Sequence, residues 1–165
     1  MFNKKYALVL FLITLTNIFT AACSPTPAQN VESEKWVIFS AKQAKEQRIG
    51  KWLAADDKAI DYWTPSEKDI RMLENNLPAF LQKNSYQLYT PDAPVWERLN
   101  EYNRQYIGIV LSEEKVIYAN YFCASFDVDW KKNFVFLLDG GACYFQFNYD
   151  ANTGEFFDLK VNGEA

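Results

Sequence analysis

The stretch of sequence that decides the fold is CYFQFNY, residues 143–149, in which aromatic and polar side chains alternate. A period of two is typical of a β-strand with one buried face, so we expect Phe145, Phe147 and Tyr149 to point together into a core. Turn-forming residues lie on both sides, DGG at 139–141 and DANTG at 150–154. Short turns join antiparallel strands, so the strand should pair with its neighbours on both sides.

Outward from this strand, other stretches are also rich in β-branched and apolar residues: 106–111, 116–122, 134–138 and 156–161. The polar residues 112–115 form a turn between the first two. Together these stretches predict a curved antiparallel sheet of four or five strands in the second half of the chain.

Before the sheet, apolar residues recur at a helical spacing: Ile70, Leu73, Leu77 and Phe80. Thr64 fits the N-cap of this helix, Pro65 its first position, and Glu67 completes a capping box. Pro78 has no N–H, which predicts a kink or an end of the helix near residues 75–76.

A second, shorter helix is expected at 94–102, whereas 36–39 suits either an edge strand or the start of a short helix. The predicted fold class is therefore α+β, with N-terminal helices packed on a face of the antiparallel sheet. The order of a helix followed by a meander resembles the cystatin-like arrangement. Residues 149–156, YDANTGEF, resemble the hairpin of PepSY-type periplasmic domains.

The N-terminus has the pattern of an export signal. Lys4 and Lys5 precede an apolar run at 7–19, which is too short to cross a bilayer of about 30 Å. The small residues at 20–22 and the following Cys23 resemble the lipobox of bacterial lipoproteins, although the position that is usually leucine is Thr20.

This resemblance implies that residues 1–22 are a lipoprotein signal peptide and that Cys23 is acylated, with palmitate among its chains. The alternative is ordinary secretory cleavage near Ala22, which leaves Cys23 unmodified. Ser24 after the cysteine implies sorting to the outer membrane, on the side that faces the periplasm. Residues 24–34 contain two prolines and no aromatic residue, so they serve as a flexible tether of at most about 34 Å.

Composition limits the function of what remains. Removing residues 1–22 leaves 143 residues, enough for a single domain at 35–165. The formal net charge falls from −4 to −6 when Lys4 and Lys5 are removed, which disfavours binding to nucleic acid and to anionic lipid surfaces. The chain contains no histidine, which excludes Ser-His and Cys-His nucleophiles, HExxH zinc sites and a histidine pH switch.

Cys123 and Cys143 belong to an exported chain, so we expect a disulfide between them. If 134–138 were a strand between them in a simple meander, they would lie about 17 Å apart, whereas a disulfide requires Cα atoms within ~7 Å. Three alternatives remain open: the 124–131 segment runs back along the sheet, the pairing is not a simple meander, or the cysteines are two unbridged, buried small residues.

The carboxylates Asp127, Asp129 and Asp139 lie near Trp130 in the sequence. Paired carboxylates beside an aromatic platform are typical of glycosidases, whereas the same residues also serve to solvate a loop or begin a turn. We expect no cofactor and no metal site. For calcium, the aspartate spacing at 150–155 lacks the EF-hand register.

Aromatic residues are too numerous to fit beneath one helix, which predicts a half-exposed binding surface on the second face of the sheet. Its candidate residues are Tyr118, Trp130, Tyr144, Gln146 and Asn148. The leading hypothesis is a non-catalytic interaction lipoprotein of the bacterial cell envelope that binds a protein, peptide or glycan. The alternative is a carboxylate-dependent hydrolase of envelope glycans.

Residues 102–165 resemble a family of small uncharacterised bacterial exported proteins. The resemblance is carried by Tyr106, Trp130, the turn at 139–141, Cys143 and the ending VNGEA at 161–165. It implies a fold and no function.

Overall fold

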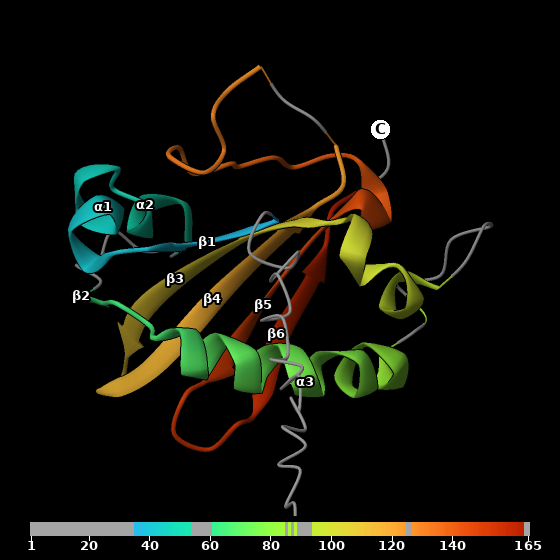
Figure 1. Cartoon of the computed structure of the whole chain (residues 1–165), viewed down its shortest axis with the longest axis horizontal. Helices are drawn as coiled ribbons and strands as arrows, with labels where there is room; N and C mark the ends of the chain where they lie inside the picture. Colours follow the sequence, from blue (N-terminus) through green and yellow to red (C-terminus); the bar gives the residue numbers. More distant parts are fainter. Residues whose placement is uncertain are drawn as a thin grey trace, which may run out of the picture.

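The computed structural model describes residues 35–53, 61–84, 86, 88, 94–124 and 127–163. The expected signal peptide at 1–22 and the cysteine with its tether at 23–34 lie outside the described residues. In chain order the elements are β1 (Trp36–Phe39), α1 (Ala41–Glu46), α2 (Gly50–Leu53), β2 (Asp61–Trp63), α3 (Glu67–Lys83), β3 (Asn103–Leu111), β4 (Glu114–Phe122), β5 (Tyr144–Asp150) and β6 (Phe156–Val161). Figure 1 shows their α+β arrangement around one open sheet.

The sheet has six strands, more than the four or five expected. Strands β3, β4, β5 and β6 form the predicted antiparallel meander in sequence order. The unassigned stretch 36–39 is a strand, β1, which runs parallel to β3, and the short β2 pairs with the other half of the same edge. A helix followed by an antiparallel meander is therefore present, with two short strands added on the β3 side.

The apolar stretch 134–138 is not a strand of the sheet, which corrects the prediction. Strand β4 pairs directly with β5, from Val116 opposite Asp150 to Phe122 opposite Tyr144. No edge of either strand is left for residues 134–138, so they cross over one face of the sheet. The expected hairpin turn at 139–141 is instead a left-handed Gly140 leading into a 3-10 turn, Gly141–Cys143.

Helix α3 begins two residues later than predicted. Ser66 is the N-cap, and its side chain and Asp69 form the capping box. Thr64 is used elsewhere, because its hydroxyl accepts a hydrogen bond from the Ala41 N–H at 2.9 Å. The helix also continues through Pro78 to Lys83. Packing of the following turn on the sheet outweighs the lost hydrogen bond, as is usual where tertiary contacts stabilise a helix.

The expected helix at 94–102 is formed by two 3-10 turns, Val95–Glu97 and Leu99–Glu101. The Arg98 N–H donates to the Val95 carbonyl and closes the first turn, and the Tyr102 N–H donates to the Leu99 carbonyl and closes the second.

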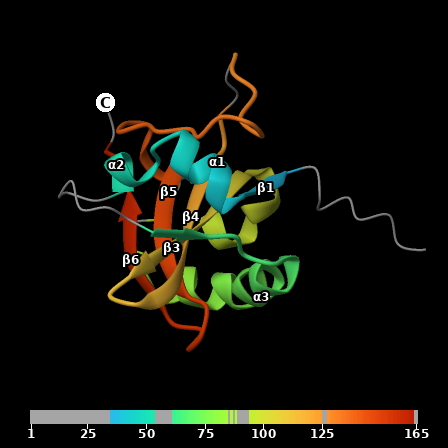
Figure 2. The same ribbon diagram turned by 90° about the vertical axis from the view of Figure 1, so that its left-hand side faces the viewer.

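Two layers of packing enclose the sheet, as Figure 2 shows. Helix α3 covers one face, called here the helix face, over a core that includes Ile70, Leu73, Leu77, Leu81, Tyr106, Tyr121, Phe145, Phe147 and Tyr149. The opposite face, called here the loop face, is covered by α1, α2 and residues 127–140. Its core is smaller and contains Phe39, Ala44, Ile49, Ile107, Ile109 and Val116.

The β3–β4 hairpin turns on two residues with positive φ, Ser112 at 50° and Glu113 at 73°. Left-handed backbone is unfavourable for residues with a Cβ, and two-residue hairpins of this shape prefer Asn-Gly. We expect the double substitution Ser112→Asn and Glu113→Gly to raise the free energy of unfolding by about 1 kcal/mol in urea titrations. Glu114→Gly, placed inside β4, is the control and should lower it; equal effects of the two changes would contradict the prediction.

Candidate functional site

The loop face is built on two buried amide side chains. Gln105 and Asn120 lie opposite each other on β3 and β4, and both are buried. Asn120 Nδ2 donates to Gln105 Oε1 at 3.2 Å. Polar groups in such a position need partners, because an unpaired buried amide is destabilising.

These two amides hold the backbone of residues 127–140, which we call the crossing segment. Gln105 Nε2 donates to the carbonyls of Trp130 and Asn133 at 2.6 and 2.8 Å. Gln105 Oε1 accepts from the Val135 N–H at 3.0 Å, and Asn120 Nδ2 donates to the Val135 carbonyl at 2.8 Å. The segment is thus fixed to the sheet mainly by side chains, and near its end Asp139 forms a single parallel β-bridge with Gly163.

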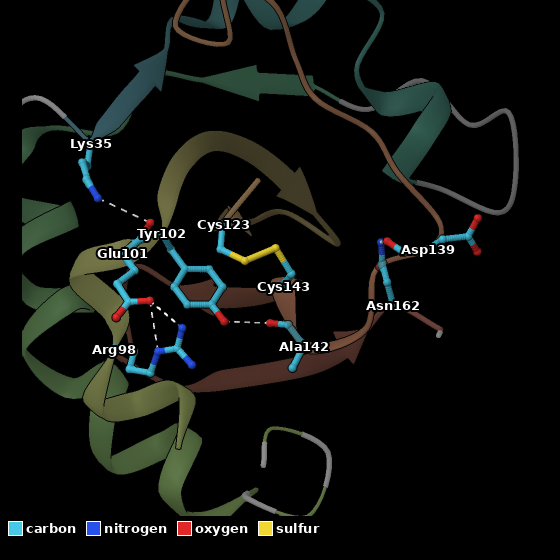
Figure 3. Close-up of a disulfide and its surroundings, with 9 residues drawn as sticks. All are labelled: Lys35, Arg98, Glu101, Tyr102, Cys123, Asp139, Ala142, Cys143 and Asn162. Atoms are coloured by element: carbon cyan, nitrogen blue, oxygen red, sulfur yellow. Dashed lines mark hydrogen bonds and ion pairs between the residues drawn. A yellow bond between two sulfur atoms is a disulfide. The ribbon is translucent and has the colours of Figure 1, made fainter. Parts of the chain in front are cut away.

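Two further amides hold the segment nearer its ends. Gln47, at the end of α1, donates to the Lys132 carbonyl at 2.7 Å and accepts from the Phe134 N–H at 2.8 Å. Asn162 Nδ2, just after β6, donates to the carbonyls of Leu137 at 2.7 Å and Asp139 at 3.2 Å. Figure 3 shows Asn162 beside Asp139.

The predicted disulfide between Cys123 and Cys143 is present, with the Cα atoms 5.1 Å apart. Cys123 follows β4 and Cys143 precedes β5, and the Cys123 N–H donates to the Cys143 carbonyl at 3.0 Å. The apparent separation of 17 Å disappears because 134–138 does not lie between them in the sheet. The disulfide therefore closes the two ends of the crossing segment (Figure 3).

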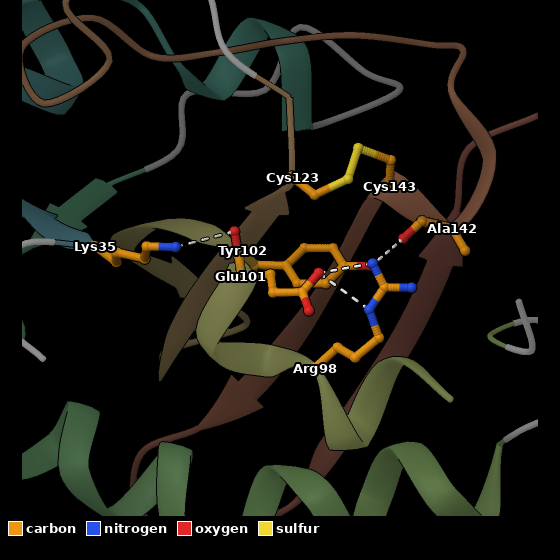
Figure 4. Close-up of polar contacts among 7 residues, drawn as sticks. All are labelled: Lys35, Arg98, Glu101, Tyr102, Cys123, Ala142 and Cys143. Carbon is orange, nitrogen blue, oxygen red and sulfur yellow. Dashed lines mark hydrogen bonds and ion pairs between the residues drawn. A yellow bond between two sulfur atoms is a disulfide. The ribbon is translucent and has the colours of Figure 1, made fainter. Parts of the chain in front are cut away.

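The base of this loop is also supported from the first half of the chain. The Tyr102 hydroxyl donates to the Ala142 carbonyl at 2.9 Å. Arg98 forms an ion pair of 2.6 Å with Glu101, and Lys35 donates to the Glu101 carbonyl at 3.4 Å, as drawn in Figure 4. The backbone next to Cys143 is thus held by a hydrogen bond from Tyr102, and the turn that carries Tyr102 is held by contacts of Glu101.

Large apolar side chains are exposed on the loop face. Leu138 is 70% exposed, and Trp52 on α2 is 56% exposed. Trp52 contacts Phe136, with ring centroids 4.9 Å apart. We call the set formed by Trp52, Phe136, Leu137 and Leu138 the apolar loop surface. Val128, on the same crossing segment, is exposed as well.

The residues predicted for the binding surface lie on or beside the same face, but the structure gives most of them partners. Tyr118 is largely covered, its ring lies 6.3 Å from that of Phe134, and burial raises the pKa of its hydroxyl. Trp130 is half-buried and meets Phe122 edge-on at 5.7 Å.

The other three predicted residues follow one another along β5. Tyr144 is half-buried, and burial raises the pKa of its hydroxyl. Gln146 donates to Asn162 at 3.4 Å, and Asn148 donates to Asp158 at 3.3 Å. These side chains share a face as expected, whereas the most exposed apolar groups of this face lie on 136–138 and α2.

The predicted carboxylates Asp127, Asp129 and Asp139 are all exposed. Asp129 forms an ion pair of 2.9 Å with Lys132, and this hydrogen-bonded partner lowers the pKa of its carboxyl group. It also accepts a hydrogen bond from the Lys131 N–H. These contacts are typical of an aspartate in a solvent-exposed turn. They do not support the alternative of a glycan hydrolase.

A second polar cluster, which sequence reasoning missed, lies under α3. Glu74 forms an ion pair of 3.0 Å with Arg104 and accepts hydrogen bonds from the hydroxyls of Tyr106 and Tyr121. The two tyrosine hydroxyls are 2.8 Å apart. With every member tied to another, the cluster fastens α3 to the sheet.

The two tyrosines make stability depend on alkaline pH. Burial, with the negative charge of Glu74 adding to it, raises the pKa of both hydroxyls well above 10. A pKa raised in the folded state gives stability that is present below pH 10 and lost as the pH rises. For each tyrosine that stays neutral, we expect the free energy of unfolding to fall by about 1.4 kcal/mol per pH unit above 10.

Urea titrations between pH 9 and pH 12 measure this slope. Tyr106→Phe and Tyr121→Phe should each make it shallower, while Tyr86→Phe, at an exposed position, is the matched control. A stability that stays constant from pH 9 to pH 11.5 would contradict the assignment.

Among the described residues, no group of three or more Cys, Asp or Glu side chains is placed to hold a metal ion. The described part of the chain also contains no helix that is both long and apolar enough to span a membrane. Comparison with known proteins found no matching protein family, no matching curated protein and no matching solved structure.

Proposed function

We propose that this protein is a lipoprotein of the bacterial cell envelope that acts as a non-catalytic interaction module. In this proposal Cys23 carries the lipid, residues 24–34 form the tether, and the domain is held at the outer membrane on its periplasmic side. The working part is the apolar loop surface.

The observation that carries the proposal is the way the crossing segment is fixed. A disulfide closes it, and the amides of Gln47, Gln105, Asn120 and Asn162 hold its backbone. Yet Leu138 and its neighbours point outward instead of completing the core. Covering a leucine stabilises a complex by roughly 1.5–3 kcal/mol, and a loop that is already ordered loses little entropy on binding.

Site-specific crosslinking tests the interaction. A photoreactive benzophenone amino acid placed at Leu138 should yield a discrete crosslinked product in the native envelope. The same group at Met72, which is exposed on α3, is the matched control and should yield none. Equal crosslinking at the two positions, or none at Leu138, would refute a binding role for the loop surface.

Mass spectrometry of the N-terminal peptide tests the anchor. We expect an acylated Cys23 and loss of the protein from the membrane fraction after Cys23→Ser. A processed N-terminus that carries no acyl chain would contradict the proposed lipid anchor. It would not affect the binding role of the apolar loop surface, which the crosslinking tests independently.

A further inference from the structure

We propose that residues 136–138 bind an extended peptide segment of a partner protein by strand addition along their outer edge. This rests on the proposed function, because it names the kind of partner that the apolar loop surface receives. The ligand is an extended polypeptide with unprotected backbone N–H and C=O groups.

The inner edge of residues 134–138 is already paired as a strand would be. Val135 uses both its N–H and its carbonyl, which bond to Gln105 and Asn120. Two residues later, the Leu137 carbonyl accepts from Asn162. Side-chain amides, two from the sheet and one from Asn162 just after β6, thus take the place of a neighbouring strand on alternate residues. Figure 1 shows this stretch as a trace without a helix, and the chain bends at Leu138.

Of the intervening residues, Phe134 donates its N–H to Gln47 Oε1, whereas Phe136 and Leu138 have unpaired backbone groups. Among the described residues, no partner is present for the N–H or the carbonyl of Phe136, or for the N–H of Leu138. Successive peptide groups of an extended chain point to opposite sides, so these groups face away from the amides that hold Val135. Phe136 and Leu138 are both exposed. This alternation is the backbone pattern that an added strand requires.

The open edge of the sheet at β6 is protected against pairing, whereas this segment is not. Strand β6 is interrupted by a register shift against β5, by Asp158 at a φ of 53°, and by the exposed Lys160. Bulges and charges of this kind prevent unwanted pairing of edge strands. Residues 134–138 read FVFLL, with no charge, glycine or proline.

Side chains beside this edge favour an apolar residue in the partner. Trp52 lies against Phe136, and Leu138 is the most exposed of the large apolar side chains near it. An added strand would place alternate side chains over these groups. Backbone pairing then supplies affinity for any extended segment, and the apolar side chains select which one binds.

The test uses the mature chain, residues 23–165 with its disulfide intact, and a phage-displayed library of random linear nonapeptides as the probe. Selected peptides are synthesised in three forms: unmodified, N-methylated at odd positions, and N-methylated at even positions. N-methylation removes backbone donors on one edge of the peptide only. We expect one methylated form to bind at least ten times more weakly, and the other to bind like the unmodified peptide.

Phe136→Pro removes the free N–H without touching the bonds of Val135 or Leu137, and should weaken binding at least tenfold. Phe136→Leu is the matched control, because it keeps the N–H and an apolar side chain, and should stay within about threefold of the wild type. In the wild type, hydrogen exchange should show the amides of Phe136 and Leu138 becoming protected when the peptide binds, a readout that holds even if Phe136→Pro fails to fold.

Failure to select any peptide, equal binding of both methylated forms, or unprotected Phe136 and Leu138 amides in the complex would overturn the proposal. Binding of the wild type to neutral phosphatidylcholine vesicles or to a second copy of the chain in place of peptide would also overturn it. A specific crosslink at Leu138 together with any of these results would leave the interaction role standing and remove strand addition alone.

Discussion

Replacing Glu74 with alanine is expected to lower the free energy of unfolding by about 3–5 kcal/mol, the largest effect of any single change considered for this fold. The substitution leaves the Arg104 guanidinium charged in a place where its side chain is only 10% exposed. It also removes the acceptor of the Tyr106 and Tyr121 hydroxyls. A buried donor that loses its acceptor destabilises the folded state, because its bonds to water were given up on folding and nothing replaces them.

Urea titrations of three variants separate this cluster from ordinary helix effects. Glu74→Gln keeps an acceptor oxygen but loses the charge opposite Arg104, so its loss should be smaller, about 1–3 kcal/mol. Glu67→Ala removes an exposed ion pair with Arg71 and should change stability by less than about 1 kcal/mol. Similar losses for Glu74→Ala and Glu67→Ala would show that the cluster does not fasten α3.

The strands of the meander could be predicted because local pattern and tertiary structure agree. Strand β5 alternates strictly, and β6 matches the predicted bounds of 156–161. The N-cap of α3 was predicted wrongly at Thr64, and local pattern alone does not separate it from Ser66, because each residue stands three positions before an acidic residue. A contact from another element decides between them, since Thr64 bonds to the N–H of Ala41. No local pattern could reveal that contact.

The crossing segment shows the same limit at the candidate site. FVFLL at 134–138 has the composition of a buried strand, but the direct pairing of β4 with β5 excludes it from the sheet. The only local signal was polar: Asn120 interrupts an otherwise apolar stretch, and Gln105 directly precedes another. Trp52 could not be assigned to the surface, because its contact with Phe136 joins residues far apart in the sequence.

Replacing both Cys123 and Cys143 with serine is expected to lower the free energy of unfolding by about 3 kcal/mol. The disulfide closes a loop with a sequence separation of 20 residues, and the chain-entropy relation gives about 3 kcal/mol for that length. For a domain of this size the melting temperature should fall by roughly 10 °C. Calorimetry of the oxidised wild type and the double variant measures this change.

The location of the loss is as informative as its size. Without the disulfide, the backbone of residues 132–139 is still held by the amides of Gln47, Gln105, Asn120 and Asn162 and by the β-bridge of Asp139 with Gly163. We therefore expect exchange of the Val135 amide with solvent to speed up more than the loss of global stability explains, while amides in the centre of β4 and β5 speed up only by as much as that loss. Gln105→Leu in the oxidised protein is the complementary control, because it keeps the disulfide and removes the amide that holds Val135. If the double serine variant melts with the wild type and Val135 stays equally protected, the disulfide does not order the loop, and the apolar loop surface must be held by the amides alone.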